Sequence, residues 1–268
     1  MTDPTIIIGT GLAVLGSKDV LTKILGPTAD YLGNEAKGLV EKCNINLNSV
    51  FERAKRKLGE RIDQPGAVSP RVLRHILDDA RFCEDELAAE YYGGLLAGSR
   101  ELGGTDDRSL PYLSKVKQMS VYQIRLHFAF YYEVLRHHKD AGLNLGVGTD
   151  CGKAGLVIPH EFLIAFLPPA DLSSKYWSLM SHSVVGLHSL GLIGSYGYGD
   201  IKSHLTSFTN ASENAIYMAP TFSGAELFMW ALGLEMPSGH QFFKTDIATV
   251  EKTIPILENT LAKNRSES

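Results

Sequence analysis

The glycine-spaced apolar segment over residues 5–16 is the first part of the chain whose residue types could do chemistry. Three isoleucines followed by two glycines could form the strand and phosphate-binding turn of a dinucleotide-binding fold. That fingerprint needs a third small residue, normally glycine, where Val14 stands, and no second strand precedes the acidic Asp30. Ser17 and Lys18 follow a glycine in the reverse of the order that places a P-loop lysine against phosphates. These glycines therefore do not predict a nucleotide-binding loop.

The nucleophilic and metal-binding residue types form no pattern of a catalytic centre. The sequence contains no HExxH, no paired-cysteine zinc spacing and no Gly-x-Ser-x-Gly nucleophile elbow. His182 and His188 are six positions apart, about 240° around a helix, so they are poorly placed to share a ligand. Cys43, Cys83 and Cys151 are widely separated and odd in number, which indicates free thiols in a reducing compartment. We expect a protein without enzyme activity or cofactor, and a nuclease or transferase is only the third alternative.

Two charged stretches fit solvated helix faces. Basic residues outnumber acids over residues 52–61, and residues 84–90 carry four carboxylates with no histidine at helical spacing among them. The net charge of −4 is too small to predict a nucleic-acid or membrane partner from the overall field. We expect both stretches to face solvent.

Aromatic and cationic side chains gather in a glycine-rich segment, residues 194–214, and on the helix before it. Such side chains can stack on bases and contact phosphates in single strands. The alternative is an ordinary loop whose aromatic rings pack on the protein. The candidate ligand-binding residues are Lys175, Tyr196, Tyr198, Lys202, His204 and Phe208.

The apolar N-terminus is also a candidate membrane segment. As a helix, residues 5–16 would be about 18 Å long, short of a hydrocarbon core of roughly 30 Å. Gly9, Ala13 and Ser17 would share one stripe, which allows close helix contact in membranes. Several copies could insert residues 5–25 together, with Lys18 and other polar groups turned to a water-filled lumen. The membrane-inserting residues would be Ile6, Ile7, Ile8, Gly9, Leu12, Ala13, Leu15 and Gly16.

The alternative for this N-terminal segment is a buried core helix or strand. No basic residue precedes its apolar run, so the segment does not predict a secretory signal.

The elements that must position these residues are mainly helical. Apolar spacing predicts helices over residues 17–58 with a break at Gly26-Pro27, and over 70–77, 81–96, 109–138, 161–167, 172–190, from 221 and over 247–261. Short strands are predicted over residues 156–159, 191–193 and 215–219. The fold class is mainly α (α+β). We divide the chain into an N-terminal segment 1–25, a helical oligomerisation region 26–105, and a winged-helix-like domain with a small β-hairpin, 106–268.

Four parts of the chain carry a family resemblance: the run ILGPTADYLG at residues 24–33, the helix with a basic end that follows it, residues 84–97, and the pair 190–193 and 218–228. Together they resemble the abortive-infection alpha family. The resemblance covers about residues 21–233, with a longer wing and Ala219-Pro220-Thr221 where Leu-Thr-Pro is usual. It implies a role in bacterial defence against phage, and no catalytic residues carry over.

The family resemblance and the apolar N-terminal pattern together predict a cytoplasmic effector that associates with the bacterial inner membrane. Its partners would be further copies of itself, inner-membrane lipid, and a nucleotide or single-stranded oligonucleotide that gates a pore or channel. The alternative is a soluble winged-helix regulator of defence that binds nucleic acid.

Overall fold

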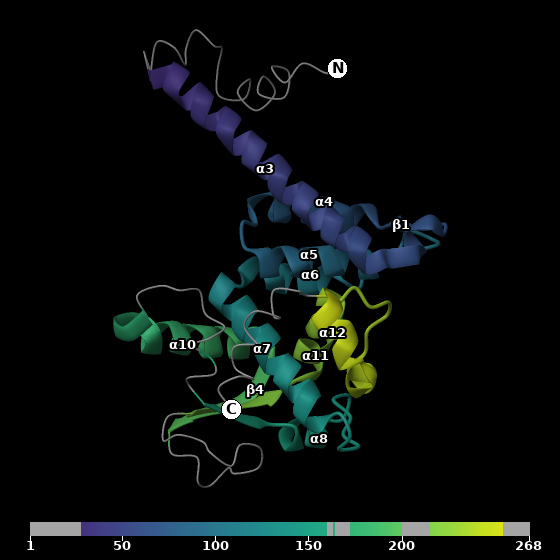
Figure 1. Cartoon of the computed structure of the whole chain (residues 1–268), viewed down its shortest axis with the longest axis vertical. Helices are drawn as coiled ribbons and strands as arrows, with labels where there is room; N and C mark the ends of the chain where they lie inside the picture. The colour runs from purple at the N-terminus through teal and green to yellow at the C-terminus, as the bar shows by residue number, and fades with distance from the viewer. Residues whose placement is uncertain (1–27, 160–162, 164–171, 200–214, 254–268) are drawn as a thin grey trace. The chain divides into compact units, whose positions relative to one another are not determined.

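The computed structural model describes residues 28–159, 163, 172–199 and 215–253 (Figure 1). The chain divides into two compact units, Met1–Ile45 and Asn46–Ser268. In order, the elements are α3 (Thr28–Leu58), η1 (Gly59–Asp63), β1 (Ala67–Val68), α4 (Pro70–Asp79), η2 (Ala80–Phe82), α5 (Glu86–Gly98), β2 (Arg100–Glu101), α6 (Leu110–Gln118), α7 (Val121–His138), α8 (Gly148–Lys153), β3 (Leu156–Pro159), α10 (Leu172–Ser189), β4 (Ile193–Gly199), β5 (Ala215–Pro220), α11 (Phe222–Ala231), η3 (Gly239–Lys244) and α12 (Ile247–Thr253).

The prediction of a mainly helical protein with short strands is confirmed. The described strands form two small antiparallel sheets, β1-β2 and β3-β5-β4. The predicted helix over residues 172–190 corresponds to α10, and the predicted strands over 156–159 and 215–219 correspond to β3 and β5. The helix predicted over residues 161–167 and the membrane segment 1–25 lie outside the described residues.

Local capping signals explain several of these boundaries. Ser120 and Gln123 form a reciprocal capping box at the start of α7. Gly191, with φ of 67°, ends α10 in a Schellman motif, in which the Leu192 amide donates to the Leu187 carbonyl at 2.9 Å. These signals act within a few residues of the helix ends. The sequence predicts the end of α10 within one residue, but it gives no boundary between α6 and α7.

Two predicted boundaries are wrong. The helix expected from residue 81 begins at Glu86, because the Asp85 carboxylate accepts a hydrogen bond from the Ala88 amide at 3.0 Å and caps the helix there. The strand expected to end at residue 193 runs on to Gly199 as β4. Pairing with β5 extends it, beyond an irregularity in the register between Ile193 and Tyr196.

The expectation that the charged stretches face solvent is wrong where α3 meets α5. Glu90 is 2% exposed, and its carboxylate forms ion pairs with Arg53, Arg56 and Lys57. The Lys57 side chain is fully buried, and this burial lowers its pKa to about 8 although Glu90 acts in the opposite direction. Gly93 permits the close approach, because a Cβ there would overlap Arg53. We call these four charged residues the Glu90 cluster.

The core of the second unit is built around α7, whose aromatic side chains pack against α11 and η3. Phe128, Tyr131, Phe228 and Phe242 are fully buried, with ring centroids 5.2 to 6.2 Å apart in the pairs that touch. His127 lies among them. Its Nδ1 accepts from the Tyr91 hydroxyl at 2.6 Å if its Nε2–H donates to a backbone carbonyl of α11, which lies at 3.2 Å. Burial lowers the pKa of His127 to about 3, so the ring is neutral.

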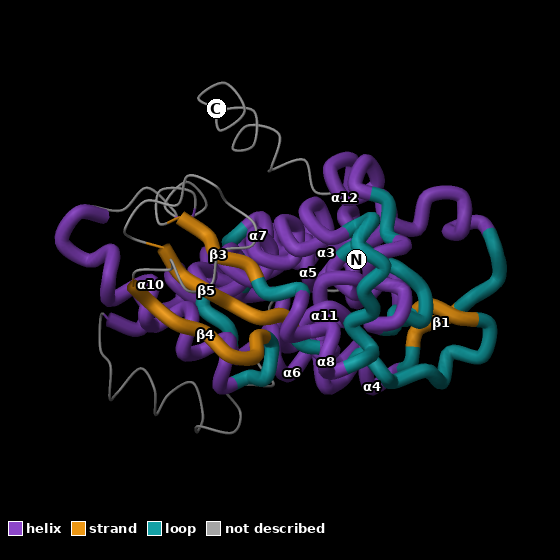
Figure 2. Tube along the Cα trace, turned by 90° about the horizontal axis from the view of Figure 1, so that it is seen from below, coloured by secondary structure: helices purple, strands orange, loops and turns teal. Residues whose placement is uncertain are grey.

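The three-stranded sheet lies beside α10, as Figure 2 shows with the strands in orange. Its central strand is β5, which pairs with β3 from Leu156↔Met218 to Pro159↔Ala215 and with β4 from Ile193↔Pro220 to Gly199↔Ala215. No helix within the described ranges is long and apolar enough to cross a membrane.

Candidate ligand-binding face

Helix α10 and strand β4 carry four ring-bearing side chains, and those of the strand contact the helix. Two come from the helix, Trp177 and His188, and two come from the strand, Tyr196 and Tyr198. We call these four residues the aromatic face.

The rings of the aromatic face follow one another from the helix to the strand. The His188 and Tyr196 centroids lie 5.2 Å apart at 67°, and the Tyr196 and Tyr198 centroids lie 5.9 Å apart at 78°. Tyr198 in turn hydrogen bonds with Ser181, which is one helical turn from Trp177. The strand therefore runs along α10 and holds its tyrosines against the helix.

Much of this apolar surface is open to solvent. Trp177 is 55% exposed, and Tyr198 and Val185 are each 42% exposed. Partial burial raises the pKa of Tyr198 above its ordinary value, so the hydroxyl keeps its proton at neutral pH. An exposed tryptophan ring offers a flat surface on which a planar ring can stack.

Hydrogen bonds of two histidines fix the position of α10 relative to β4 and α7. The His188 Nδ1–H donates to the Gly194 carbonyl at 2.8 Å, provided that this tautomer is present. His182 Nε2 lies 3.1 Å from the Ser120 hydroxyl at the start of α7. One histidine thus ties α10 to β4 and the other ties it to α7.

The face carries almost no fixed charge. Over residues 172–199 the sequence has one lysine, no arginine and no carboxylate. A helix that reads duplex DNA normally needs several cations for the phosphates. The composition of this face suits stacking better than duplex binding.

The structure brings together two of the predicted ligand-binding residues. Tyr196 and Tyr198 are neighbours, but they lie in β4 and not in the loop that the sequence predicts there. Lys175 belongs to α10, while its side chain lies outside the described part, as do Lys202, His204 and Phe208.

Trp177 and His188 were missed as candidates for this face. A sequence signal was present, because Trp177, Ser181 and Val185 recur every four residues. That spacing is equally typical of a helix face turned to the core, and the exposure of Trp177 separates the two interpretations.

Two further observations concern the rest of the chain. The membrane segment, Ile6, Ile7, Ile8, Gly9, Leu12, Ala13, Leu15 and Gly16, lies outside the described residues. Within the described residues, no three His, Cys, Asp or Glu side chains gather so that they could hold a metal ion.

Compared with known proteins, the chain matches no family model, no curated protein and no solved structure.

Proposed function

We propose that the chain is a bacterial anti-phage effector of the abortive-infection type, and that its C-terminal part binds a nucleotide or a short single-stranded oligonucleotide. The proposal rests on the family resemblance and on one observation of the structure, the exposed aromatic face of α10 and β4. The N-terminal residues 5–25 of several copies would insert into the inner membrane when the ligand changes the state of the assembly.

The topology of the three-stranded sheet supports a winged-helix-like module. The order β3-β5-β4 is antiparallel, with α7 before the first strand and α10 between β3 and β4 in the chain. In such a module α10 would take the place of the recognition helix. The ring-bearing side chains of α10 and β4 would then lie where this kind of domain meets its ligand.

The chemistry of the aromatic face favours bases over phosphates. Stacking of a base on an aromatic ring contributes about 1–3 kcal/mol and tolerates any base. Trp177 and Tyr198 supply such rings, and Lys175 is the nearest cation in the sequence of α10. A ligand held in this way would be single-stranded or mononucleotide, because the bases of a duplex are already stacked.

Tryptophan fluorescence tests this ligand directly. The chain has two tryptophans, and Trp230 is only 3% exposed, so quenching by an added ligand reports on Trp177. We expect a ten-nucleotide single strand to quench the emission and the matching duplex to have little effect. Tyr198→Ala should weaken single-strand binding by roughly 5- to 150-fold, the equivalent of 1–3 kcal/mol.

Phe51→Ala provides the matched control, since Phe51 is an equally exposed ring, at 41%, on α3. It should leave the quenching curve unchanged. Equal quenching by the duplex and the single strand would favour the alternative, a soluble regulator that binds double-stranded DNA. A quenching curve that Tyr198→Ala does not move would exclude the aromatic face as the site.

The membrane part of the proposal needs its own experiment. Replacing Gly9 and Ala13 by leucine should abolish toxicity and loss of membrane potential in expressing cells, because bulky side chains prevent close helix contact. The control is a pair of leucines at Ile7 and Ile8, which keeps the segment apolar. Toxicity that persists in a chain lacking residues 1–16 would contradict the pore.

A further inference from the structure

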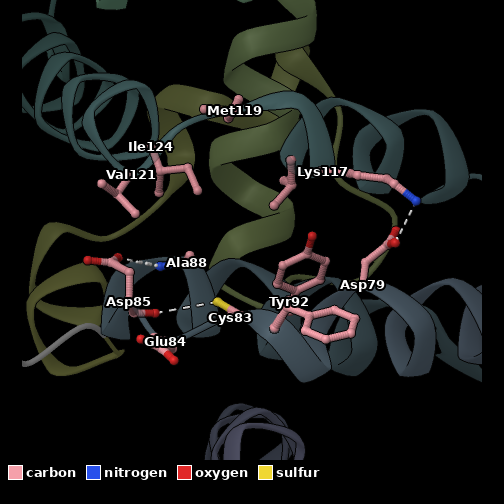
Figure 3. A pocket seen from close by; sticks show the side chains of 12 residues that line it. Asp79, Cys83, Glu84, Asp85, Ala88, Tyr92, Lys117, Met119, Val121 and Ile124 are labelled. Atoms are coloured by element: carbon pink, nitrogen blue, oxygen red, sulfur yellow. Dashed lines mark hydrogen bonds and ion pairs between the residues drawn. The ribbon is translucent and has the colours of Figure 1, made fainter. Parts of the chain in front are cut away.

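A cavity between α5, α6 and α7 has no role in the proposed function. It has a volume of about 350 Å³, within the range of small-molecule sites. Its floor is apolar and consists of Ala88, Val116, Met119 and Ile124, all of them buried. Figure 3 shows Met119 and Ile124 across the cavity from the acidic side chains at the end of α4 and just before α5.

Tyr92 supplies a polar group inside this cavity. The residue is 5% exposed, and Figure 3 shows its hydroxyl pointing into the space that the labelled side chains enclose. The hydroxyl makes no hydrogen bond to any residue that the structure describes. Burial raises the pKa of Tyr92, and the negative charge of Asp79 acts in the same direction, so the hydroxyl stays protonated. A hydroxyl that faces a cavity and has no protein partner is free to bind water or a ligand.

Asp79 places a second polar group beside Tyr92. Its side chain is 8% exposed, and its Oδ1 accepts from the Lys117 ammonium at 2.6 Å. The other carboxylate oxygen, Oδ2, has no partner among the residues described. Asp79 can therefore accept a second donor without losing its ion pair.

Carboxylates outnumber cations around the cavity. Three carboxylates line it, Asp79, Glu84 and Asp85, and two cations pair with them, Lys117 with Asp79 and Arg125 with Asp85. Both Asp85 oxygens are already engaged, one by the Ala88 amide and the other by Arg125 at 2.8 Å. A negatively charged ligand would meet repulsion here, and a cation would meet attraction.

We propose that this cavity is a binding site for a small organic cation, an ammonium group on an apolar stem. The ammonium donates to the free oxygen of Asp79 and to the Tyr92 hydroxyl oxygen, and the stem lies along Met119 and Ile124. The site is separate from the aromatic face, and the proposal does not depend on the function suggested for that face.

Three probes of equal length separate charge from apolar contact: n-hexylamine, n-hexanol and hexanoate. Each probe is titrated at millimolar concentrations while the NMR signals of the Met119 and Ile124 methyl groups are followed. These methyl groups line the cavity, so their signals report on binding there. We expect hexylamine to bind at least tenfold more tightly than hexanol, and hexanoate not to bind. Asp79→Asn should weaken hexylamine at least fivefold and leave hexanol unchanged, and Tyr92→Phe should weaken hexylamine while keeping the ring.

Asp78→Asn is the matched control, because Asp78 is the neighbouring acid on α4, is exposed, and does not line the cavity. It should leave all three affinities as they are. Three results would each overturn the proposal. Hexanol could bind as tightly as hexylamine, hexylamine could leave the methyl signals unmoved, or Asp78→Asn could weaken hexylamine as much as Asp79→Asn does. Unfolding curves of every variant show whether a lost signal reflects a lost fold.

Discussion

Replacing Glu90 by glutamine should be among the most damaging single changes to the stability of this protein. Glu90 is 2% exposed and is the carboxylate that pairs with Arg53, Arg56 and the fully buried Lys57. Removing one partner of a buried ion pair typically costs about 3–5 kcal/mol, because the remaining charge stays buried without compensation. We expect Glu90→Gln to lower the free energy of unfolding by that amount.

The same cluster predicts a pH dependence. The pKa of Lys57 is lowered by burial from 10.5 to about 8, so between these pH values the unfolded chain binds more protons than the folded one. Stability from this group therefore rises with pH over that window, by about 2 to 3 kcal/mol between pH 7 and pH 10. Lys57→Met should remove this rise, and the difference between wild type and variant isolates the lysine because other groups titrate in both.

Urea unfolding followed by circular dichroism measures these quantities. Glu52→Gln, at an exposed position of α3, is the control and should change stability by less than about 0.5 kcal/mol. Lys57→Met in the Glu90→Gln background should restore part of the loss, since it removes an unpaired buried charge. A loss below about 1 kcal/mol for Glu90→Gln, or a Lys57→Met protein with the wild-type pH slope, would refute the argument.

Three further predictions concern the core. Burial lowers the pKa of His127 from 6.5 to about 3, so the unfolded chain binds more protons than the folded chain between these pH values, and the free energy of unfolding should fall by about 2 kcal/mol from pH 7 to pH 5. His127→Gln should flatten this pH dependence in urea unfolding, and an unchanged pH dependence would contradict the prediction. Gly94→Ala should lower the unfolding free energy by at least about 2 kcal/mol, although alanine is the better helix former, because its Cβ would overlap the Ala231 carbonyl; Gly148→Ala, with open space around it, is the control. Tyr131→Phe should cost about 1–3 kcal/mol in thermal unfolding, because its buried hydroxyl bridges two backbone groups, and a neutral effect would mean that water replaces it.

Local signals in the sequence account for most of the secondary structure. The apolar spacing over residues 172–190 predicts α10 and its end. The short strands β3 and β5 are likewise visible as apolar runs between turn residues. Such signals depend on neighbours within about one helical turn, so a single sequence contains them in full.

The extent of β4 depends on its pairing with β5, which lies later in the sequence. Tyr196 and Tyr198 lie in a glycine-rich stretch that is typical of a loop, yet each pairs with a residue of β5 about twenty positions later, Met218 and Ile216. The backbone hydrogen bonds of an antiparallel pair exist only when both strands are present. The residue types therefore predict these two tyrosines as candidate site residues, but the local pattern predicts the wrong kind of element for them.

The charged residues show the clearest difference between sequence and tertiary structure. By itself, the sequence determined a mainly helical chain, two tyrosines of the aromatic face, and an apolar N-terminal segment. Only the tertiary structure decided that Glu90 and Lys57 are buried together, that Trp177 is exposed, and that Asp79 and Tyr92 share a cavity. Burial is a property of segments that meet across long stretches of chain, here 33 residues between Lys57 and Glu90, and residue types at helical spacing do not record which segments meet.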